Sequence, residues 1–176
     1  MKLRAHSASL ESLKYFKPQY MSLLRPHPMW RIADTSYKVN KCVTVARMLS
    51  GRFRCGSLLR HFYPNISGIC SLCSNELESL PHILVPHCPH LAAKAVDLLR
   101  YARETLSVSL AATQIFETIM GGKDDLKKVQ FVLDPSTLSE IITAEQSETG
   151  ILALILNVTT TWCYALNRTR IKLLGN

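Results

Sequence analysis

Three cysteines and one histidine lie in the middle of the chain at a spacing that is typical of metal ligands. Cys70 and Cys73 form a Cys-x2-Cys pair, His82 follows after eight residues, and Cys88 follows after five more. A Cys-x2-Cys turn presents two thiolates together, and a histidine and a cysteine separated by a short helix can complete a tetrahedral site. The spacing therefore predicts a Cys3His site for a zinc ion (Zn2+). Because four protein ligands leave no open position for water, we expect a structural ion and not a catalytic one.

Two residue types compete for the fourth ligand position. His87 and His90 flank Cys88, so a Cys2His2 set that uses His87 is the alternative. We favour Cys88 because thiolate suits zinc at least as well as imidazole, and because Cys88-Pro89 would end the structural element. Glu78 lies near the ligands, where a solvated surface carboxylate is favoured over a contact with a ligand. Reduced, unliganded thiols are the alternative to the site as a whole.

No catalytic motif accompanies the predicted zinc site. A zinc deaminase needs His-x-Glu upstream of Pro-Cys-x-x-Cys, but His61 is followed by Phe62 and Tyr63, and Cys70 is preceded by Ile69. A glycine-rich phosphate loop is also missing from the sequence. We therefore expect no enzymatic activity. The remaining cysteines are expected to be small core or interface residues: Cys42, Cys55 and Cys163.

The positive charge of the chain is concentrated in its first part. The 176 residues carry 21 Lys+Arg and 13 Asp+Glu, a net charge of +8, whereas residues 1–69 hold 12 and 2, a net charge of +10. Such a field attracts polyanions through counterion release: nucleic acid is the first candidate, an anionic membrane surface the second, and a solvated basic face the alternative to both. RNA is the favoured ligand, and DNA is the alternative. The predicted phosphate contacts are Arg47, Arg52, Arg54 and Arg60.

Aromatic residues alternate with the cations of this first part. The pattern recurs in Trp30-Arg31, Arg52-Phe53-Arg54 and Arg60-His61-Phe62-Tyr63. Exposed rings stack on unpaired bases, so the alternation favours single-stranded or structured RNA. Taken singly, Trp30, Phe53 and Phe62 are expected to be core residues, and the arginines carry the binding hypothesis.

Hydrophobic periodicity predicts a mainly α protein, with small helical domains around the zinc site followed by a C-terminal helical bundle. We divide the chain into a basic arm or linker (1–35), basic helices with the zinc module (36–90) and a helical C-terminal region (91–176). In the helix expected from Ser36 to Leu49, Lys38, Lys41 and Arg47 would form a basic face. Further helices are expected over 57–62, 91–106 and 109–120, and from Asp134-Pro135 onward.

The last part of the chain contains a stretch without charge. Residues 149–167 hold no Lys, Arg, Asp or Glu, which is nearly the length of a membrane span. Asn157 and Thr159 to Thr161 interrupt this stretch, and its apolar residues recur at helical spacing, so we expect a buried C-terminal helix and no membrane contact. The sequence start MKLRAHSASLESLK has no apolar export segment, and six cysteines are too few for a disulfide scaffold. We therefore expect an intracellular protein of the nucleus or cytoplasm, not a secreted one.

Several motifs resemble the zinc-binding region that follows the polymerase in reverse transcriptases of LINE-type (non-LTR) retrotransposons. The resemblance implies a CCHC module that helps the element's protein hold its RNA or target DNA, and it implies the polymerase portion of a parent retroelement protein as a partner. The stretches that carry it are ARMLSGRFRCG (46–56), SGICSLC (67–73), ESLPHIL (78–84), HCP (87–89) and TWCYALNRTR (161–170).

The sequence also departs from that family. A polymerase holds its metal ions with an acidic pair in a strand-turn context, whereas Asp124-Asp125 follows Gly121-Gly122-Lys123 in what we interpret as a loop before a helix. The ordered acidic and histidine set of a retroelement endonuclease is missing as well. The chain therefore resembles a detached C-terminal portion. The alternatives to nucleic-acid binding are a structural or protein-interaction fragment, which an exposed apolar C-terminal helix would favour, and a retroelement relic without activity of its own.

Overall fold

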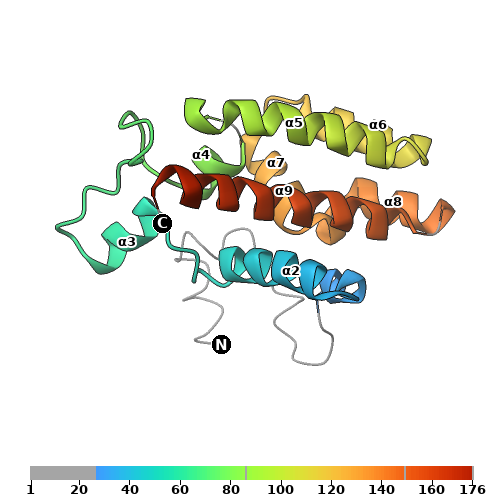
Figure 1. The fold of residues 1–176 in the computed structure, drawn as a ribbon. Coiled ribbons are helices and arrows are strands. Elements are labelled where there is room, and N and C mark those ends of the chain that lie inside the picture. Colours follow the sequence, from blue (N-terminus) through green and yellow to red (C-terminus); the bar gives the residue numbers. More distant parts are fainter. Residues whose placement is uncertain (1–26, 86, 149, 176) are drawn as a thin grey trace, which may run out of the picture.

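Helices dominate the architecture, which a computed structural model defines for residues 27–85, 87–148 and 150–175 (Figure 1). The predicted mainly α class is confirmed. The part of the predicted arm at 1–26 lies outside the described residues. The elements in chain order are the 3-10 helix η3 (Pro28–Ile32), α2 (Ser36–Leu49), α3 (Gly56–Phe62), α4 (Leu80–Leu84), α5 (Pro89–Leu106), α6 (Leu110–Met120), α7 (Asp125–Leu133), the 3-10 helix η4 (Pro135–Thr137), α8 (Ser139–Ser147) and α9 (Ile151–Leu173).

The C-terminal helix α9 forms the centre of the fold. It packs against α5 on one side and α2 on the other, and it also contacts α4, α7 and α8 (Figure 1). Its buried face comprises Ile151, Ile155, Val158, Trp162 and Leu166. One hydrophobic core therefore joins residues of the predicted regions 36–90 and 91–176. An exposed apolar C-terminal helix would favour a protein-interaction fragment. The apolar face of α9 is instead buried, and only Ile171 and Leu173 at its end are exposed large hydrophobic residues of this helix.

The hydroxyl groups of Thr160 and Thr161, inside the uncharged stretch, find hydrogen-bond acceptors within α9 itself. The Thr160 hydroxyl donates to the Leu156 carbonyl (2.7 Å) and the Thr161 hydroxyl donates to the Asn157 carbonyl (2.6 Å). This bonding to the preceding turn lets threonines enter a helical core without unpaired hydroxyl groups. From Ile151 onward the uncharged stretch is thus part of a helix with a buried face, as predicted.

None of the helices in the described part of the chain combines the length and the apolar character needed to cross a bilayer.

The described end of the predicted arm is not extended. Residues 28–32 form η3, which packs against α2 and α9, and Met29 is buried. The Cys42 thiol donates to the Met29 carbonyl (3.3 Å), and His27 Nε2 lies 3.0 Å from a carboxylate oxygen of buried Asp134. Contacts with distant residues therefore fix this segment, which periodicity along the chain does not reveal.

Helix α2 has the predicted bounds, but Lys41, one of the three residues of the predicted basic face, does not lie on the surface. Lys41 is buried, with its ammonium group 2.9 Å from the Thr161 hydroxyl and 4.3 Å from the centre of the Tyr37 ring. Burial lowers the pKa of Lys41. Its long stem lets an amine reach a polar partner from inside a packed interface, so the prediction was wrong for Lys41. Arg47 is exposed.

The acidic pair that sequence analysis placed in a loop begins α7. Asp124 is the N-cap, and its carboxylate accepts a hydrogen bond from the Lys127 amide (3.0 Å). Capping accounts for an aspartate at this position without any metal. The helix expected from Asp134-Pro135 is divided in two: a 3-10 turn, η4, precedes α8.

Candidate metal centre

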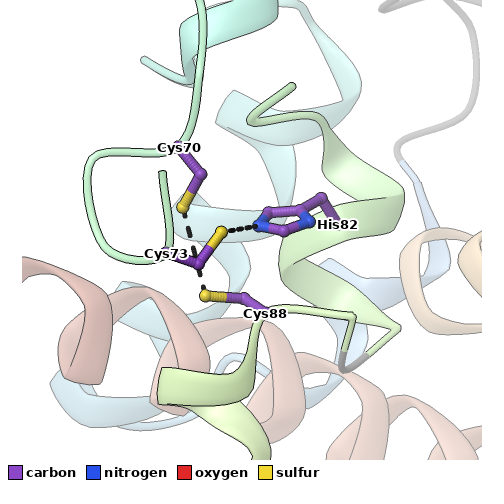
Figure 2. Close-up of side chains that lie close together, drawn as sticks. All are labelled: Cys70, Cys73, His82 and Cys88. Atoms are coloured by element: carbon purple, nitrogen blue, oxygen red, sulfur yellow. Dashed lines mark hydrogen bonds between the residues drawn. The ribbon is translucent and has the colours of Figure 1, made fainter. Parts of the chain in front are cut away.

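The structure brings together the four side chains that the spacing predicts as ligands. The Cys70 and Cys88 sulfurs lie 4.0 Å apart, and the Cys73 sulfur lies 3.4 Å from His82 Nε2. All four candidate ligand atoms lie within 4.8 Å of one another. Figure 2 shows the side chains converging from three segments of the chain: a loop, helix α4 and the residue before α5. This Cys3His cluster could hold a metal ion.

A tight turn presents the two cysteines of the Cys-x2-Cys pair. Ile69 and Leu77 form an isolated antiparallel bridge, and between them the Cys70 amide donates to the Glu76 carbonyl (2.8 Å). The Ser74 amide donates to the Cys70 carbonyl (2.8 Å), and Ser74 adopts a left-handed conformation with φ of 56°. Since non-glycine residues rarely adopt this conformation, the surrounding hydrogen bonds must hold the turn in place.

The other two ligands belong to elements anchored in the core. Ser79 caps α4 by accepting the His82 amide (3.3 Å), and the Leu84 carbonyl at the end of α4 accepts the Trp162 indole N–H of α9 (2.9 Å). Cys88 is the N-cap of α5, with Pro89 in the first turn. Cys88-Pro89 therefore begins a helix, and the prediction that it ends an element was wrong, since proline favours the first helical turn.

Glu76 orients the histidine of the cluster. A Glu76 carboxylate oxygen lies 3.0 Å from His82 Nδ1, while Nε2 faces Cys73. Metal-bound histidines commonly donate their second ring N–H to a carboxylate, which fixes the tautomer and raises the basicity of the ligand nitrogen. Sequence analysis missed Glu76. Its only signal was an acidic residue between the cysteine pair and the histidine.

Replacing Glu76 with glutamine is expected to weaken metal binding about 10- to 100-fold, because the His82 ring loses its carboxylate partner. Competition of the purified protein with a chromogenic chelator measures this change. The matched control is Glu104→Gln, an exposed carboxylate on α5 about 24 Å along that helix from Cys88. Equal metal affinity in both variants would contradict a role for Glu76.

The local environment shifts the pKa values of two of the thiols, Cys73 and Cys88, in opposite directions. Backbone N–H groups of Asn75 and then Glu76 lower the pKa of Cys73 to about 7. Burial, with the neighbouring Cys70 thiol, raises the pKa of Cys88 to about 11. Cys73 thus ionises before Cys88, and a bound cation deprotonates its coordinating thiols outright.

The alternative ligand His87 does not join the cluster. Its side chain is exposed, and Nε2 lies 3.0 Å from a carboxylate oxygen of Asp125 at the start of α7. The geometry of the four clustered side chains thus favours the set with Cys88.

Glu78 is not a solvated surface carboxylate, contrary to the prediction. It is buried and forms two hydrogen bonds with Arg170 of α9: Nε donates to Oε1 (2.7 Å) and Nη2 donates to Oε2 (2.8 Å). Oε2 also accepts the Gly56 amide at the start of α3 (2.7 Å). Glu78 therefore ties α3 and the cysteine-bearing loop to the end of α9.

The predicted phosphate-binding arginines lie in α2, in α3 and in the segment between these helices. Arg47 belongs to α2, Arg52 and Arg54 lie between α2 and α3, and Arg60 belongs to α3; all are exposed. Within residues 27–85, 87–148 and 150–175, none of their guanidinium groups forms an ion pair.

The aromatic predictions had mixed outcomes. Phe53 is buried, as expected, but Trp30 and Phe62 are exposed, so the core prediction was wrong for these two rings. Helix α3 lies at the edge of the fold, beyond the C-terminal end of α9 (Figure 1), where few neighbours cover Phe62.

The remaining cysteines are buried, as predicted. Burial raises the pKa of Cys42 and of Cys163. Cys55 is also buried and is the N-cap of α3. These thiols are packing residues of the core.

The chain matches no protein-family model, no curated protein and no solved structure. The resemblance to retrotransposon reverse transcriptases remains a prediction from the motifs that carry it.

Proposed function

We propose that the chain is a zinc-binding, non-catalytic module that binds nucleic acid, with RNA favoured over DNA. The observation that carries this proposal is a Cys3His cluster on a loop that contacts Arg60, one of four exposed arginines without carboxylate partners in the described residues. The cluster would supply local rigidity, and the arginines would supply the contacts with phosphate.

The donor set supports zinc as the metal. Three thiols and one imidazole form a soft set that suits Zn2+ better than Ca2+ or Mg2+, which prefer oxygen. Ligand atoms of a tetrahedral zinc site, with bonds of about 2.3 Å to sulfur and about 2.0 Å to nitrogen, lie about 3.5 to 3.8 Å apart. The Cys70–Cys88 and Cys73–His82 distances of 4.0 and 3.4 Å are close to these values. Four protein ligands would fill the coordination sphere, which supports a structural role.

Contacts within the fold hold the segments that carry these arginines. The Arg52 amide donates to the Arg47 carbonyl (2.9 Å), and the Arg54 carbonyl accepts Nη2 of Arg170 (3.2 Å). Gly68, two residues before Cys70, packs so closely against Arg60 that a Cβ atom added to it would lie 3.2 Å from Arg60 Cδ. The zinc-bearing loop would therefore support the stem of Arg60, while its guanidinium group is exposed to solvent.

Binding to a labelled single-stranded RNA is expected to weaken steeply with salt. Neutralising about four phosphates on a single strand gives a slope of log affinity against log salt near −3. Replacing Arg47, Arg52, Arg54 and Arg60 together with alanine is expected to reduce both the affinity and the magnitude of the slope. Fluorescence anisotropy with RNA and with duplex DNA measures both quantities.

The matched control for this experiment is the double variant Arg100→Ala/Arg103→Ala. Both arginines are exposed on α5, but each pairs with a carboxylate, Asp97 or Glu117. The control is expected to retain the wild-type slope. A chelator is expected to weaken binding if the metal fixes the arginine surface. Affinity that does not change with salt, or equal binding by the four-arginine variant, would overturn the proposed function.

A further inference from the structure

Two aromatic residues that are neighbours in sequence are exposed where α3 ends. The side chains of Phe62 and Tyr63 have exposed fractions of 63% and 61%, and Ile66, three residues on, is exposed as well. Aromatic rings are among the side chains that gain most from burial, so an exposed adjacent pair calls for a ligand more than a single exposed ring does.

Hydrogen bonds fix the backbone that carries these rings. The Tyr63 amide donates to the Leu59 carbonyl (2.8 Å), and the Ile66 amide donates to the Tyr63 carbonyl (2.9 Å), which closes a turn. The His61 ring packs edge-on against Phe62, with ring centres 5.2 Å apart and planes at 80°. The backbone that carries the rings therefore forms a defined turn. The rings can contact a ligand without a large rearrangement of this backbone.

The charges around the rings favour a polyanionic ligand. Arg60 lies on the same short helix, and Arg54 lies just before it; both are exposed. The nearest carboxylates in sequence beyond α3 are engaged: Glu76 contacts His82, and buried Glu78 pairs with Arg170. An apolar protein partner would not need this excess of cations, whereas a nucleic acid uses cations for phosphate and rings for bases.

We infer that Phe62 and Tyr63 are a stacking platform for unpaired bases, so that this surface selects single-stranded over duplex nucleic acid. The inference rests on the proposed function and specifies its ligand. In a duplex the bases are already stacked and paired, so the rings have no free base face to contact, whereas unpaired bases can turn onto them. Base stacking on an aromatic side chain strengthens binding by about fivefold to 150-fold per base.

The test uses the full, zinc-loaded chain with a labelled RNA of about 12 nucleotides, alone and annealed to its complement. Phe62→Ala and Tyr63→Ala are each expected to weaken binding to the single strand by about fivefold or more and to leave duplex binding and the salt slope unchanged. Phe62→Trp keeps a ring and is expected to retain binding, whereas Phe62→Leu keeps only apolar surface and is expected to lose it. Val108→Ala, at the exposed turn between α5 and α6, is the control for loss of an exposed apolar side chain.

The outcomes separate this inference from the proposed function. Salt-dependent binding that survives Phe62→Ala and Tyr63→Ala unchanged, or that Phe62→Leu preserves, would overturn the stacking platform and leave the phosphate contacts standing. The absence of salt-dependent binding to either RNA would overturn both. If the ring variants lost affinity for phosphatidylserine vesicles but not for the single strand, the rings would serve a membrane surface and the inference would be wrong.

Discussion

Replacing Cys73 with serine is expected to abolish zinc binding and to release the loop around residues 66–79, while the helices packed on α9 stay folded. The loop and the helices are expected to respond differently because the fold anchors the four ligands unequally. His82 is held by α4, which hydrogen-bonds to Trp162, and Cys88 begins α5. Cys70 and Cys73 instead lie on a loop that is held by a few hydrogen bonds, one isolated bridge and, at its end, the Glu78–Arg170 pair. The metal would join this loop to the core.

The free energy of zinc binding is large for so short a segment. Structural zinc sites bind with about 10 to 16 kcal/mol, which is comparable with the whole stability of a domain at about 5 to 15 kcal/mol. Hydrogen exchange is the direct measurement. The amides of Cys70, Ser74 and Glu78, which donate to Glu76, Cys70 and Gly68, are expected to lose protection in the variant. The amides inside α5 and α9 are expected to keep it.

The zinc content of the protein and the dependence of its stability on zinc concentration test the same prediction in a second way. The wild-type chain is expected to contain about one zinc per chain. Its stability is expected to rise by about 1.4 kcal/mol for each tenfold increase in free zinc above the dissociation constant, and the stability of Cys73→Ser is expected not to respond.

Cys55→Ser is the matched control for the loss of one thiol in the same region. Cys55 is buried outside the cluster, and as the N-cap of α3 it occupies a position where serine is a favourable residue. This variant is expected to retain the metal and the protection of the loop amides. Loop amides that stay protected in Cys73→Ser, or a wild-type stability that does not respond to zinc, would contradict a structural metal site.

The bounds of α2 and the candidate metal ligands could be predicted from the sequence because they depend on residues close together in the chain. Helix α2 begins and ends at the predicted residues because its apolar spacing and capping threonine act within a few residues. The ligand residues could be found because a Cys-x2-Cys turn and a short helix bring nearby residues together. The preference for Cys88 over His87 came from the affinity of thiolate for zinc. The structure places Cys88, and not His87, beside the other three side chains.

The features that sequence analysis missed depend on contacts between distant segments. Buried Lys41 donates a hydrogen bond to the Thr161 hydroxyl of α9, and buried Glu78 pairs with Arg170 of the same helix. Phe62 is exposed because α3 lies at the edge of the fold. Charge and hydrophobicity describe what a side chain prefers, but its environment depends on which distant segments pack around it.

Arg170→Met is expected to destabilise the protein by about 3 to 5 kcal/mol, because it leaves the Glu78 carboxylate buried without a countercharge. The exposed fractions of the Arg170 and Glu78 side chains are only 12% and 6%, so water does little to compensate. The Gly56 amide would remain as a hydrogen-bond donor to the carboxylate. Methionine keeps much of the apolar stem beside Phe53, whose ring centre lies 5.7 Å from the Arg170 guanidinium carbon, so the variant removes charge more than packing.

Urea unfolding at saturating zinc measures this effect, and a second substitution tests its cause. Glu78→Gln removes the buried charge but keeps an oxygen that can accept the Gly56 amide. The double variant Glu78→Gln/Arg170→Met is therefore expected to be more stable than Arg170→Met alone, which is the non-additivity expected of a direct charge pair. Arg103→Met is the control, because its partner Glu117 is exposed on the surface and solvent screens exposed pairs.

The same pair connects stability with the proposed binding surface. Nη2 of Arg170 donates to the Arg54 carbonyl, so the loss of this group frees the segment that carries Arg52 and Arg54. Arg170→Met is therefore expected to weaken RNA binding under conditions in which the variant is still folded, whereas Arg103→Met is expected to leave it unchanged. If Arg170→Met unfolded no more easily than Arg103→Met, or if the double variant were as unstable as the sum of its parts, the buried pair would not be the link between α9 and the loop. The metal cluster and the apolar core alone would then join the cysteine-bearing loop to α9.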